Sequence, residues 1–123
     1  MIIGIGVDLV DLARFERAAS RTPRLLDRLF AENEQRPDGR QLPLRSLAAR
    51  FAAKEALIKA IGDSAGLRWH DVQIVSDDLR NPSFHLENRI AEVAAERGIT
   101  SIHLSMSHDA GLAIAYVIAE GGS

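Results

Sequence analysis

Asp8 is a carboxylate at the end of a predicted strand that has no side chains on one face. Residues 2–7 are β-branched and interrupted by glycine, and side chains alternate along a strand, so Gly4, Gly6 and Asp8 share a face. Because glycine carries no side chain, a ligand or a partner backbone can approach Asp8 along this strip. The alternative is that Asp8 caps the helix that follows, helped by Asp11. The residues alone leave both interpretations open.

A second carboxylate, Glu55, lies four residues before Lys59 in an alanine-rich segment typical of a helix. Residues four apart share a helix face, and most such pairs are solvated and contribute little to stability. Here Phe51 flanks Glu55 on one side and alanines on the other, and charges among apolar neighbours often mark functional sites. Arg50 and Lys54 project from a separate edge of the helix, which we interpret as the solvated strip.

His108 ends a segment in which apolar residues alternate with small or polar ones. Strand alternation points His108 to the same side as Met106, so it is either a packed or rim residue of the core, which is the commoner case, or a catalytic group. A Ser-His-Asp triad is excluded, because Ser107, His108 and Asp109 are consecutive and consecutive strand side chains diverge.

The composition limits the class of protein. With 123 residues, 46% of them hydrophobic and 26% charged, the sequence predicts a single globular domain spanning 1–123. The absence of cysteine excludes disulfides, thiolate zinc sites and a cysteine nucleophile, so any metal should be a hard cation held by carboxylates. A net charge of −2 and 5% aromatic residues argue against nucleic-acid binding. Neither a membrane span nor a signal peptide is indicated, so we expect a cytoplasmic protein.

These candidate residues must be positioned by alternating strands and helices. The longest predicted helix begins with Ser46 as its cap and ends at Gly62, and Asn88 is expected to cap the last helix. Residues 32–43 are expected to form a surface loop. The remaining predicted elements are a strand at 2–7, helices at 12–21 and 24–30, strands at 72–76 and 83–86, and a hairpin of 102–107 with 112–118.

Five arginines recur at helical spacing between residues 12 and 30, which carry a local charge of +3. Such a stripe is most often a solvated face, and the Thr22-Pro23 break can turn its second part away. The alternative is a docking surface for an acidic partner. The stripe consists of Arg14, Arg17, Arg21, Arg24 and Arg28.

Three segments, GIGVDLVDLARF, RFAAKEALIKA and LSMSHDAGLAIA, together resemble the signature segments of the holo-acyl-carrier-protein synthases, a family of small 4′-phosphopantetheinyl transferases. The resemblance implies a magnesium-dependent transfer of 4′-phosphopantetheine from coenzyme A to a serine of apo acyl carrier protein. This reaction would release adenosine 3′,5′-bisphosphate and support fatty acid biosynthesis. The implied fold is α+β, with a small antiparallel sheet packed with a long alanine-rich helix and shorter helices. The implied assembly is a homotrimer with active sites between subunits.

The resemblance also implies roles for individual residues. Asp8 and Glu55 match the magnesium ligands, Lys59 the active-site lysine, and His108 a catalytic histidine near coenzyme A. The base that accepts the serine proton stays open between Glu55, Asp109 and a metal-bound water. A hard cation held by two carboxylates agrees with attack on a pyrophosphate, whose developing charge must be neutralised.

Coenzyme A binding is implied for the part of the helix that carries Arg50, Phe51 and Lys54, together with His108. The arginine stripe would steer the acidic carrier protein toward the site. The sequence departs from the family at residues 79–82, Leu-Arg-Asn-Pro, where the family commonly has a glycine-basic-proline turn. This departure affects the expected shape of the pocket on its adenine side, and not the expected reaction. Two other functions remain: a non-catalytic oligomeric module that binds coenzyme A, and a magnesium phosphohydrolase that uses water.

Overall fold

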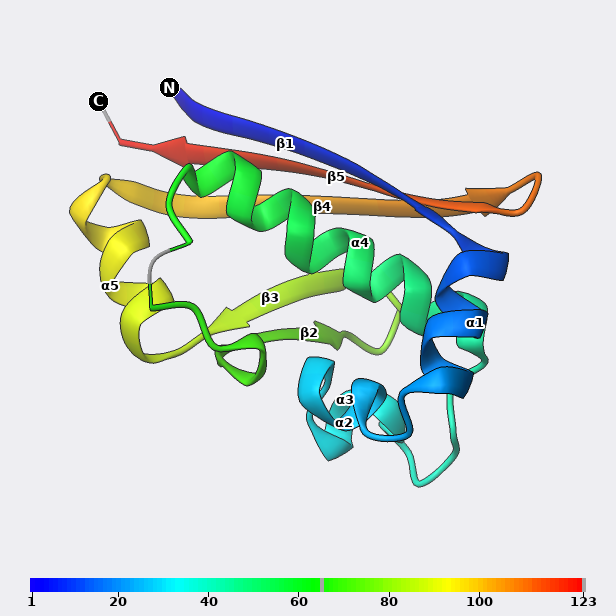
Figure 1. Cartoon of the computed structure of the whole chain (residues 1–123). Coiled ribbons are helices and arrows are strands. Elements are labelled where there is room, and N and C mark those ends of the chain that lie inside the picture. Colours follow the sequence, from blue (N-terminus) through cyan, green and yellow to red (C-terminus); the bar gives the residue numbers. More distant parts are fainter. Residues whose placement is uncertain (65, 123) are drawn as a thin grey trace.

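The computed structural model describes residues 1–64 and 66–122, and its helices and strands follow the order drawn in Figure 1. The elements are β1 (Ile2–Asp11), α1 (Leu12–Arg21), α2 (Leu25–Leu29), α3 (Glu32–Gln35), α4 (Leu44–Ile61), the 3₁₀ turn η1 (Trp69–Asp71), β2 (Val72–Ser76), β3 (Pro82–Leu86), α5 (Asn88–Glu96), β4 (Ile99–Asp109) and β5 (Leu112–Gly121).

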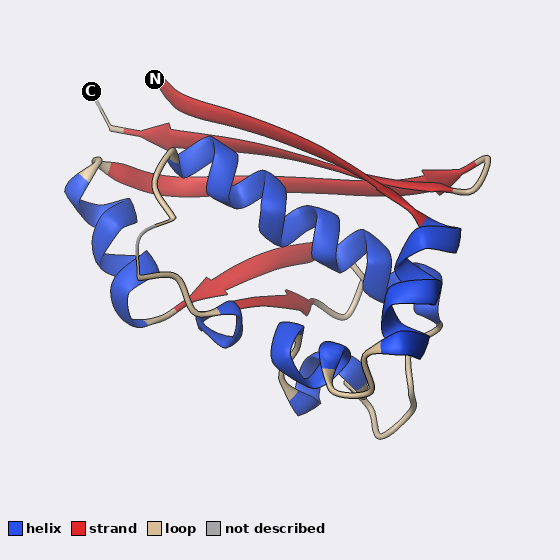
Figure 2. Cartoon of the chain, in the orientation of Figure 1, coloured by secondary structure: helices blue, strands red, loops and turns tan. Residues whose placement is uncertain are grey.

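The strands form two antiparallel sheets. The larger sheet has the order β1-β5-β4, and the smaller one pairs β2 with β3. The long helix α4 lies across the larger sheet, while the short helices gather at its two ends (Figure 2). The expected α+β architecture is therefore confirmed, with antiparallel strands packed against a long alanine-rich helix.

The glycine strip of β1 is filled by the backbone of α4. A Cβ atom added to Gly4 would lie 1.8 Å from the carbonyl oxygen of Ala60, and one added to Gly6 would lie 1.8 Å from that of Ala56. The absence of side chains thus lets helix and strand approach each other directly. A ligand or a partner backbone was expected to approach this strip, but it is occupied by α4 of the same chain.

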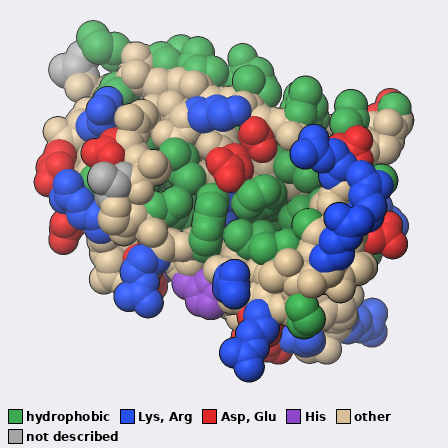
Figure 3. Space-filling model, in the orientation of Figure 1, with side chains coloured by type: hydrophobic (Ala, Val, Ile, Leu, Met, Phe, Trp, Pro, Cys, Tyr) green, Lys and Arg blue, Asp and Glu red, His purple; other side chains and the backbone are tan. Residues whose placement is uncertain are grey.

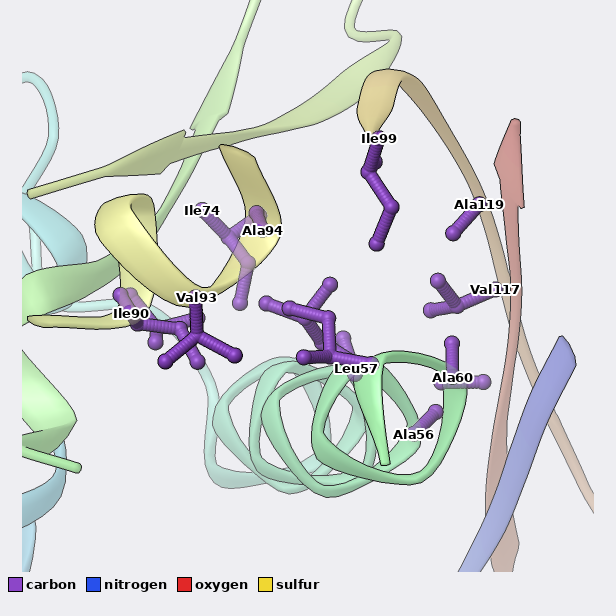
Figure 4. Packing of buried hydrophobic residues seen from close by; sticks show 14 of the residues in the cluster. Ala56, Leu57, Ala60, Ile74, Ile90, Val93, Ala94, Ile99, Val117 and Ala119 are labelled. Carbon is purple, nitrogen blue, oxygen red and sulfur yellow. The ribbon is translucent and has the colours of Figure 1, made fainter. Parts of the chain in front are cut away.

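The main core lies between α4, α5 and the two sheets (Figure 4). Small side chains face α4 from β5, among them Ala115 and Ala119, and Leu57 of α4 fills the centre without exposure. A second cluster surrounds Phe30 and Leu47 and joins α1 and α2 to the first half of α4. These two clusters fix α4 along its whole length.

The face of the larger sheet that points away from α4 remains exposed. Ile5, Val7 and Leu9 of β1 alternate with the residues that face α4, and Ile114 and Tyr116 of β5 lie beside them in the register. Each of the five is more than a third exposed. Contiguous apolar surface of this kind usually marks an interface.

Two helix starts differ from the sequence prediction. β1 continues to Asp11, and Asp11, not Asp8, caps α1 by accepting the backbone N–H of Arg14 at 3.0 Å. The interpretation of Asp8 as a helix cap is therefore wrong. The cap of α4 is Pro43 rather than Ser46, so that helix starts three residues earlier. Gly62 ends it as expected, with a φ of 84°.

Two further local predictions need correction. The cap of α5 is Glu87, whereas Asn88 has a φ of 55° and its amide donates to Asp71 Oδ1 at 3.0 Å. The expected loop at 32–43 begins with α3, and Glu34 and Gln35 are buried there. No helix within residues 1–64 and 66–122 is long and apolar enough to cross a membrane.

Candidate active site

Asp8 and Lys59 meet where β1 crosses α4. The Lys59 Nζ atom lies 3.0 Å from Asp8 Oδ1 and also donates to the Val7 carbonyl oxygen at 3.0 Å. The side chain of Lys59 is 55% exposed and that of Asp8 19% exposed. The ion pair therefore lies at an open surface, where a ligand can reach both charges.

Glu55 completes this cluster, one helical turn before Lys59. Burial raises the pKa of the Glu55 carboxyl, and the neighbouring Asp8 charge raises it further, while Lys59 acts in the opposite direction. The negative charges of the two carboxylates therefore repel each other. A divalent cation bound between the two carboxylates would offset this repulsion, and carboxylate oxygens are ligands that hard cations such as Mg²⁺ prefer. Over residues 1–64 and 66–122, no three His, Cys, Asp or Glu side chains are arranged to hold a metal ion.

The same face of the molecule carries opposite charge beside the cluster. Figure 3 shows acidic side chains over α4 and β1, a stripe of Lys and Arg side chains over α1, and hydrophobic side chains between the two. All five arginines of the predicted stripe are exposed. α1 ends at Arg21 and α2 begins at Leu25, so Arg24 and Arg28 belong to a separate helical segment.

Phe51 and Arg50 lie on α4 one turn before Glu55. The Phe51 ring packs between Phe15 of α1 and Trp69 of η1, with ring centroids 5.8 and 5.6 Å apart. Arg50 is half-buried and lines a cavity of about 1150 Å³ beside β4. Its Nε atom is buried and has no hydrogen-bond partner among the described residues, and burial lowers the pKa of its guanidinium. A role for both residues in binding coenzyme A stays a prediction.

Lys54 contradicts the expected solvated strip. Its side chain is fully buried, and Nζ lies 2.9 Å from Glu34 Oε1, whose side chain is fully buried as well. Burial lowers the pKa of Lys54, and the Glu34 charge opposes that shift. Sequence reasoning missed Glu34 because it lies in a segment without helical or strand periodicity. Direct contact of Lys54 with coenzyme A is untested, but its ammonium group is turned inward in this structure.

His108 and Asp109 lie at the end of β4, on the far edge of the sheet from β1. In the sheet register His108 pairs with Ala113, whereas Asp8 pairs with Ala115. Both residues are exposed, and Asp109 Oδ1 accepts the N–H of Ala110 in the hairpin turn at 2.9 Å. The structure thus brings Asp8, Glu55 and Lys59 together but leaves His108 and Asp109 at the other sheet edge.

Comparisons with known proteins identify the family of this chain. The family model of the 4′-phosphopantetheinyl transferase superfamily matches residues 4–117. The chain is 63% identical over 123 residues to the holo-[acyl-carrier-protein] synthase of Leifsonia xyli subsp. xyli, with all of both chains covered.

Two solved structures have the same fold. One is the holo-[acyl-carrier-protein] synthase of Neisseria meningitidis, with a TM-score of 0.84, 35% identity and coverage of 98% of this chain and 99% of that one. The other is the Helicobacter pylori synthase in complex with coenzyme A, with a TM-score of 0.79, 32% identity and coverage of 94% and 99%. The chain therefore belongs to the 4′-phosphopantetheinyl transferase superfamily, and within it to the holo-[acyl-carrier-protein] synthases.

Proposed function

We propose that this chain transfers the 4′-phosphopantetheine group of coenzyme A to a serine hydroxyl of an apo acyl carrier protein. The serine oxygen attacks the phosphorus that bears pantetheine, the pyrophosphate bond breaks, and adenosine 3′,5′-bisphosphate leaves. The observation that carries the proposal is the cluster of Asp8, Glu55 and Lys59, in which an exposed lysine lies beside two partly buried carboxylates. It is supported by the relatives named holo-[acyl-carrier-protein] synthase and by a related structure that binds coenzyme A.

Asp8 and Glu55 fit a magnesium ion. Two carboxylates that repel each other beside a solvent-exposed surface provide oxygen donors and leave the other coordination positions to phosphate and water. When bound there, Mg²⁺ would neutralise negative charge on the pyrophosphate oxygens. Asp8 is held for this role by strand β1, and Glu55 by helix α4.

Lys59 and Glu55 have distinct roles in the transfer. The Lys59 ammonium, placed 3.0 Å from Asp8, supplies a positive charge for a phosphate oxygen. The serine proton would pass to a water held by the metal, or to Glu55 where that carboxylate is not itself bound to the metal. Asp109 is the weaker candidate for this base, since it lies on the other sheet edge and binds the Ala110 N–H. His108 would bind phosphate or relay the proton.

A complete site requires a second copy of the chain, and we propose a homotrimer. Glu55 and Arg50 project about 140° apart from α4, so Glu55 faces β1 whereas Arg50 lines a cavity with Leu104 and Met106 of β4. In the proposed trimer, the Glu55 side of one subunit would lie beside the Arg50 cavity of its neighbour. The exposed apolar sheet face supports such an assembly.

The carrier protein would dock on the arginine stripe of α1 and α2. Acyl carrier proteins are acidic, and the part of this stripe over α1 lies on the same face as acidic side chains over α4 (Figure 3). Complementary charge raises the rate of encounter and fixes the orientation of the partner. We extend the proposal to fatty acid biosynthesis, which the sequence resemblance implies, and to the cytoplasm, which the sequence analysis led us to expect.

Intact-mass spectrometry of the carrier protein tests the proposed transfer. Incubation with coenzyme A and Mg²⁺ should add about 340 Da to the apo carrier protein, the mass of phosphopantetheine. A carrier protein with a serine-to-alanine change at the accepting position should gain nothing. Free phosphopantetheine with an unmodified carrier protein would instead indicate a hydrolase, and unchanged coenzyme A a binding module.

A further inference from the structure

Lys54 and Glu34 form a buried ion pair behind the candidate active site. Lys54 Nζ donates to Glu34 Oε1 at 2.9 Å, to the Leu29 carbonyl oxygen at 2.6 Å and to the Trp69 carbonyl oxygen at 3.0 Å. These three acceptors use all three N–H groups of the ammonium. The Lys54 ammonium is therefore fixed from α2, α3 and η1 at once.

Both carboxylate oxygens of Glu34 also accept hydrogen bonds from the backbone. Its Oε1 atom accepts the backbone N–H of Ala31 at 3.0 Å, and its Oε2 atom accepts the backbone N–H of Ile74 on β2 at 3.2 Å. A buried polar network whose members are all satisfied is rigid, because any shift leaves a charge without a partner. The pair consequently ties α4 to four surrounding segments.

This network lies on the opposite side of α4 from the packing of that helix against β1. Lys54 and Ala56 are two residues apart, and their positions on the helix differ by about 200°. The Ala56 carbonyl oxygen lies against the bare Gly6 of β1. The helix is thus held from both sides, and Glu55 projects between them, about 100° from each neighbour.

We propose that the Lys54–Glu34 pair positions the active site, by fixing the rotation of α4 so that the Glu55 carboxylate faces Asp8. Two carboxylates repel each other, so their mutual interaction does not hold Glu55 in place. Rotation of α4 that moved Glu55 away from Asp8 would pull the Lys54 ammonium from its three acceptors. This inference rests on the proposed transferase function and assigns Lys54 a positioning role, distinct from contact with coenzyme A.

Stability alone does not explain such a pair. Removing two charges from water is costly, and neutral residues of similar volume often replace a buried ion pair with little change in stability. Removal of only one partner strands the other charge and destabilises the fold. The test therefore replaces both residues together, in the variant Lys54→Met/Glu34→Gln.

Kinetics of this double variant separate positioning from contact with coenzyme A. We expect a folded variant with a moderately lower urea midpoint, because the Leu29 and Trp69 carbonyl oxygens lose their donor. Its kcat should fall by about tenfold to a hundredfold, and its KM for coenzyme A should stay within about twofold of the parent. A raised KM with unchanged kcat would show that Lys54 contacts coenzyme A and would overturn the proposal. If the variant does not fold, Lys54→Gln/Glu34→Gln provides the same comparison with one donor and one acceptor retained.

An exposed ion pair on the same segment supplies the matched control. Arg36 and Glu32 lie 2.7 Å apart on the surface, and Arg36→Met/Glu32→Gln should keep the parent kcat. A second comparison introduces the Lys54→Met/Glu34→Gln change into a Glu55→Gln background. If the Lys54–Glu34 pair acts through Glu55, its replacement should hardly change the residual single-turnover rate of the Glu55→Gln variant. If its role is generally structural, its replacement should lower the rate by the same factor with and without Glu55→Gln.

The outcomes separate this inference from the proposed function. If the parent chain does not modify the carrier protein, the proposed function fails. If the parent transfers phosphopantetheine and the folded double variant does so with the same kcat, the positioning role is overturned and the transferase function stands.

Discussion

Replacing Gly6 by alanine tests how closely α4 must approach β1. The new Cβ would lie 1.8 Å from the Ala56 carbonyl oxygen and 2.9 Å from the Ala60 nitrogen, both backbone atoms of α4. Ordinary van der Waals contact begins near 3.4 Å, so helix and strand must separate by about 1.6 Å. Neither partner can move a side chain aside, because both contacts are made by backbone.

The cost should lie at the upper end of the range for overpacked cores, about 3 kcal/mol. A glycine-to-alanine change that the backbone tolerates normally stabilises a protein slightly, because it restricts the unfolded state. A loss of stability in Gly6→Ala would therefore point to the close contact with α4. Activity should fall as well, because Glu55 on α4 and Asp8 on β1 would move apart, and a displacement of about 1 Å can lower the rate a hundredfold.

Urea unfolding and single-turnover transfer measure the two effects. Gly122→Ala is the control, since nothing lies within 4 Å of an added Cβ there, and it should match the parent in both assays. If Gly6→Ala keeps the parent stability within about 0.5 kcal/mol and full activity, the close packing of α4 on β1 does not position the site.

Three further predictions concern charge and assembly. In metal-free buffer, the pKa of Glu55 is raised in the folded state, so the parent loses stability as the pH rises above the ordinary carboxyl pKa of about 4.3. Urea titrations between pH 4 and 7 should therefore show Glu55→Gln gaining stability relative to the parent as the pH rises. A stability difference that does not change with pH would contradict this prediction. Arg14→Glu/Arg21→Glu should raise the KM for the carrier protein, leave that for coenzyme A nearly unchanged and weaken the salt dependence, whereas equal losses for both substrates would leave the stripe an ordinary solvated surface. Sedimentation equilibrium should give three times the 13.4 kDa chain mass for the parent and a monomer for Leu9→Glu/Tyr116→Glu, and a fully active monomeric parent would refute the shared site.

Local signals in the sequence predicted the elements that carry the site. The helix at 12–21 is confirmed with its bounds, because the Thr22-Pro23 pair ends it, and the end of α4 at Gly62 is confirmed by a left-handed backbone. The alternation of Gly4, Gly6 and Asp8 predicted a bare strand face, which the structure fills with α4. These features depend on neighbours in sequence.

Features that depend on distant residues were missed. β1 extends to Asp11 because it pairs with β5 along its length, and no residue near Asp8 encodes that pairing. Lys54 was expected in solvent because a charged residue on a helix usually is. Its partner Glu34 is 20 residues away in the chain, in a segment that shows no periodic pattern.

The candidate site was predicted only in part, because it too depends on residues that are distant in the chain. Glu55 and Lys59 were paired by their spacing, but Lys59 makes its ion pair with Asp8, 51 residues away in the chain. Asp8, Glu55 and Lys59 nevertheless converge as the resemblance implied. His108 does not join them within one chain, and spacing along the sequence carried no information on that separation.

The most direct test of the central claim is a mutant cycle on the two carboxylates. Asp8→Ala, Glu55→Ala and the double variant should each be folded, and their single-turnover transfer to the carrier protein is followed by intact mass. If both carboxylates act as one unit with magnesium, each single change should lower the rate nearly as much as the double change does. Independent effects that multiply in the double variant, or normal transfer by Glu55→Ala, would contradict a shared site.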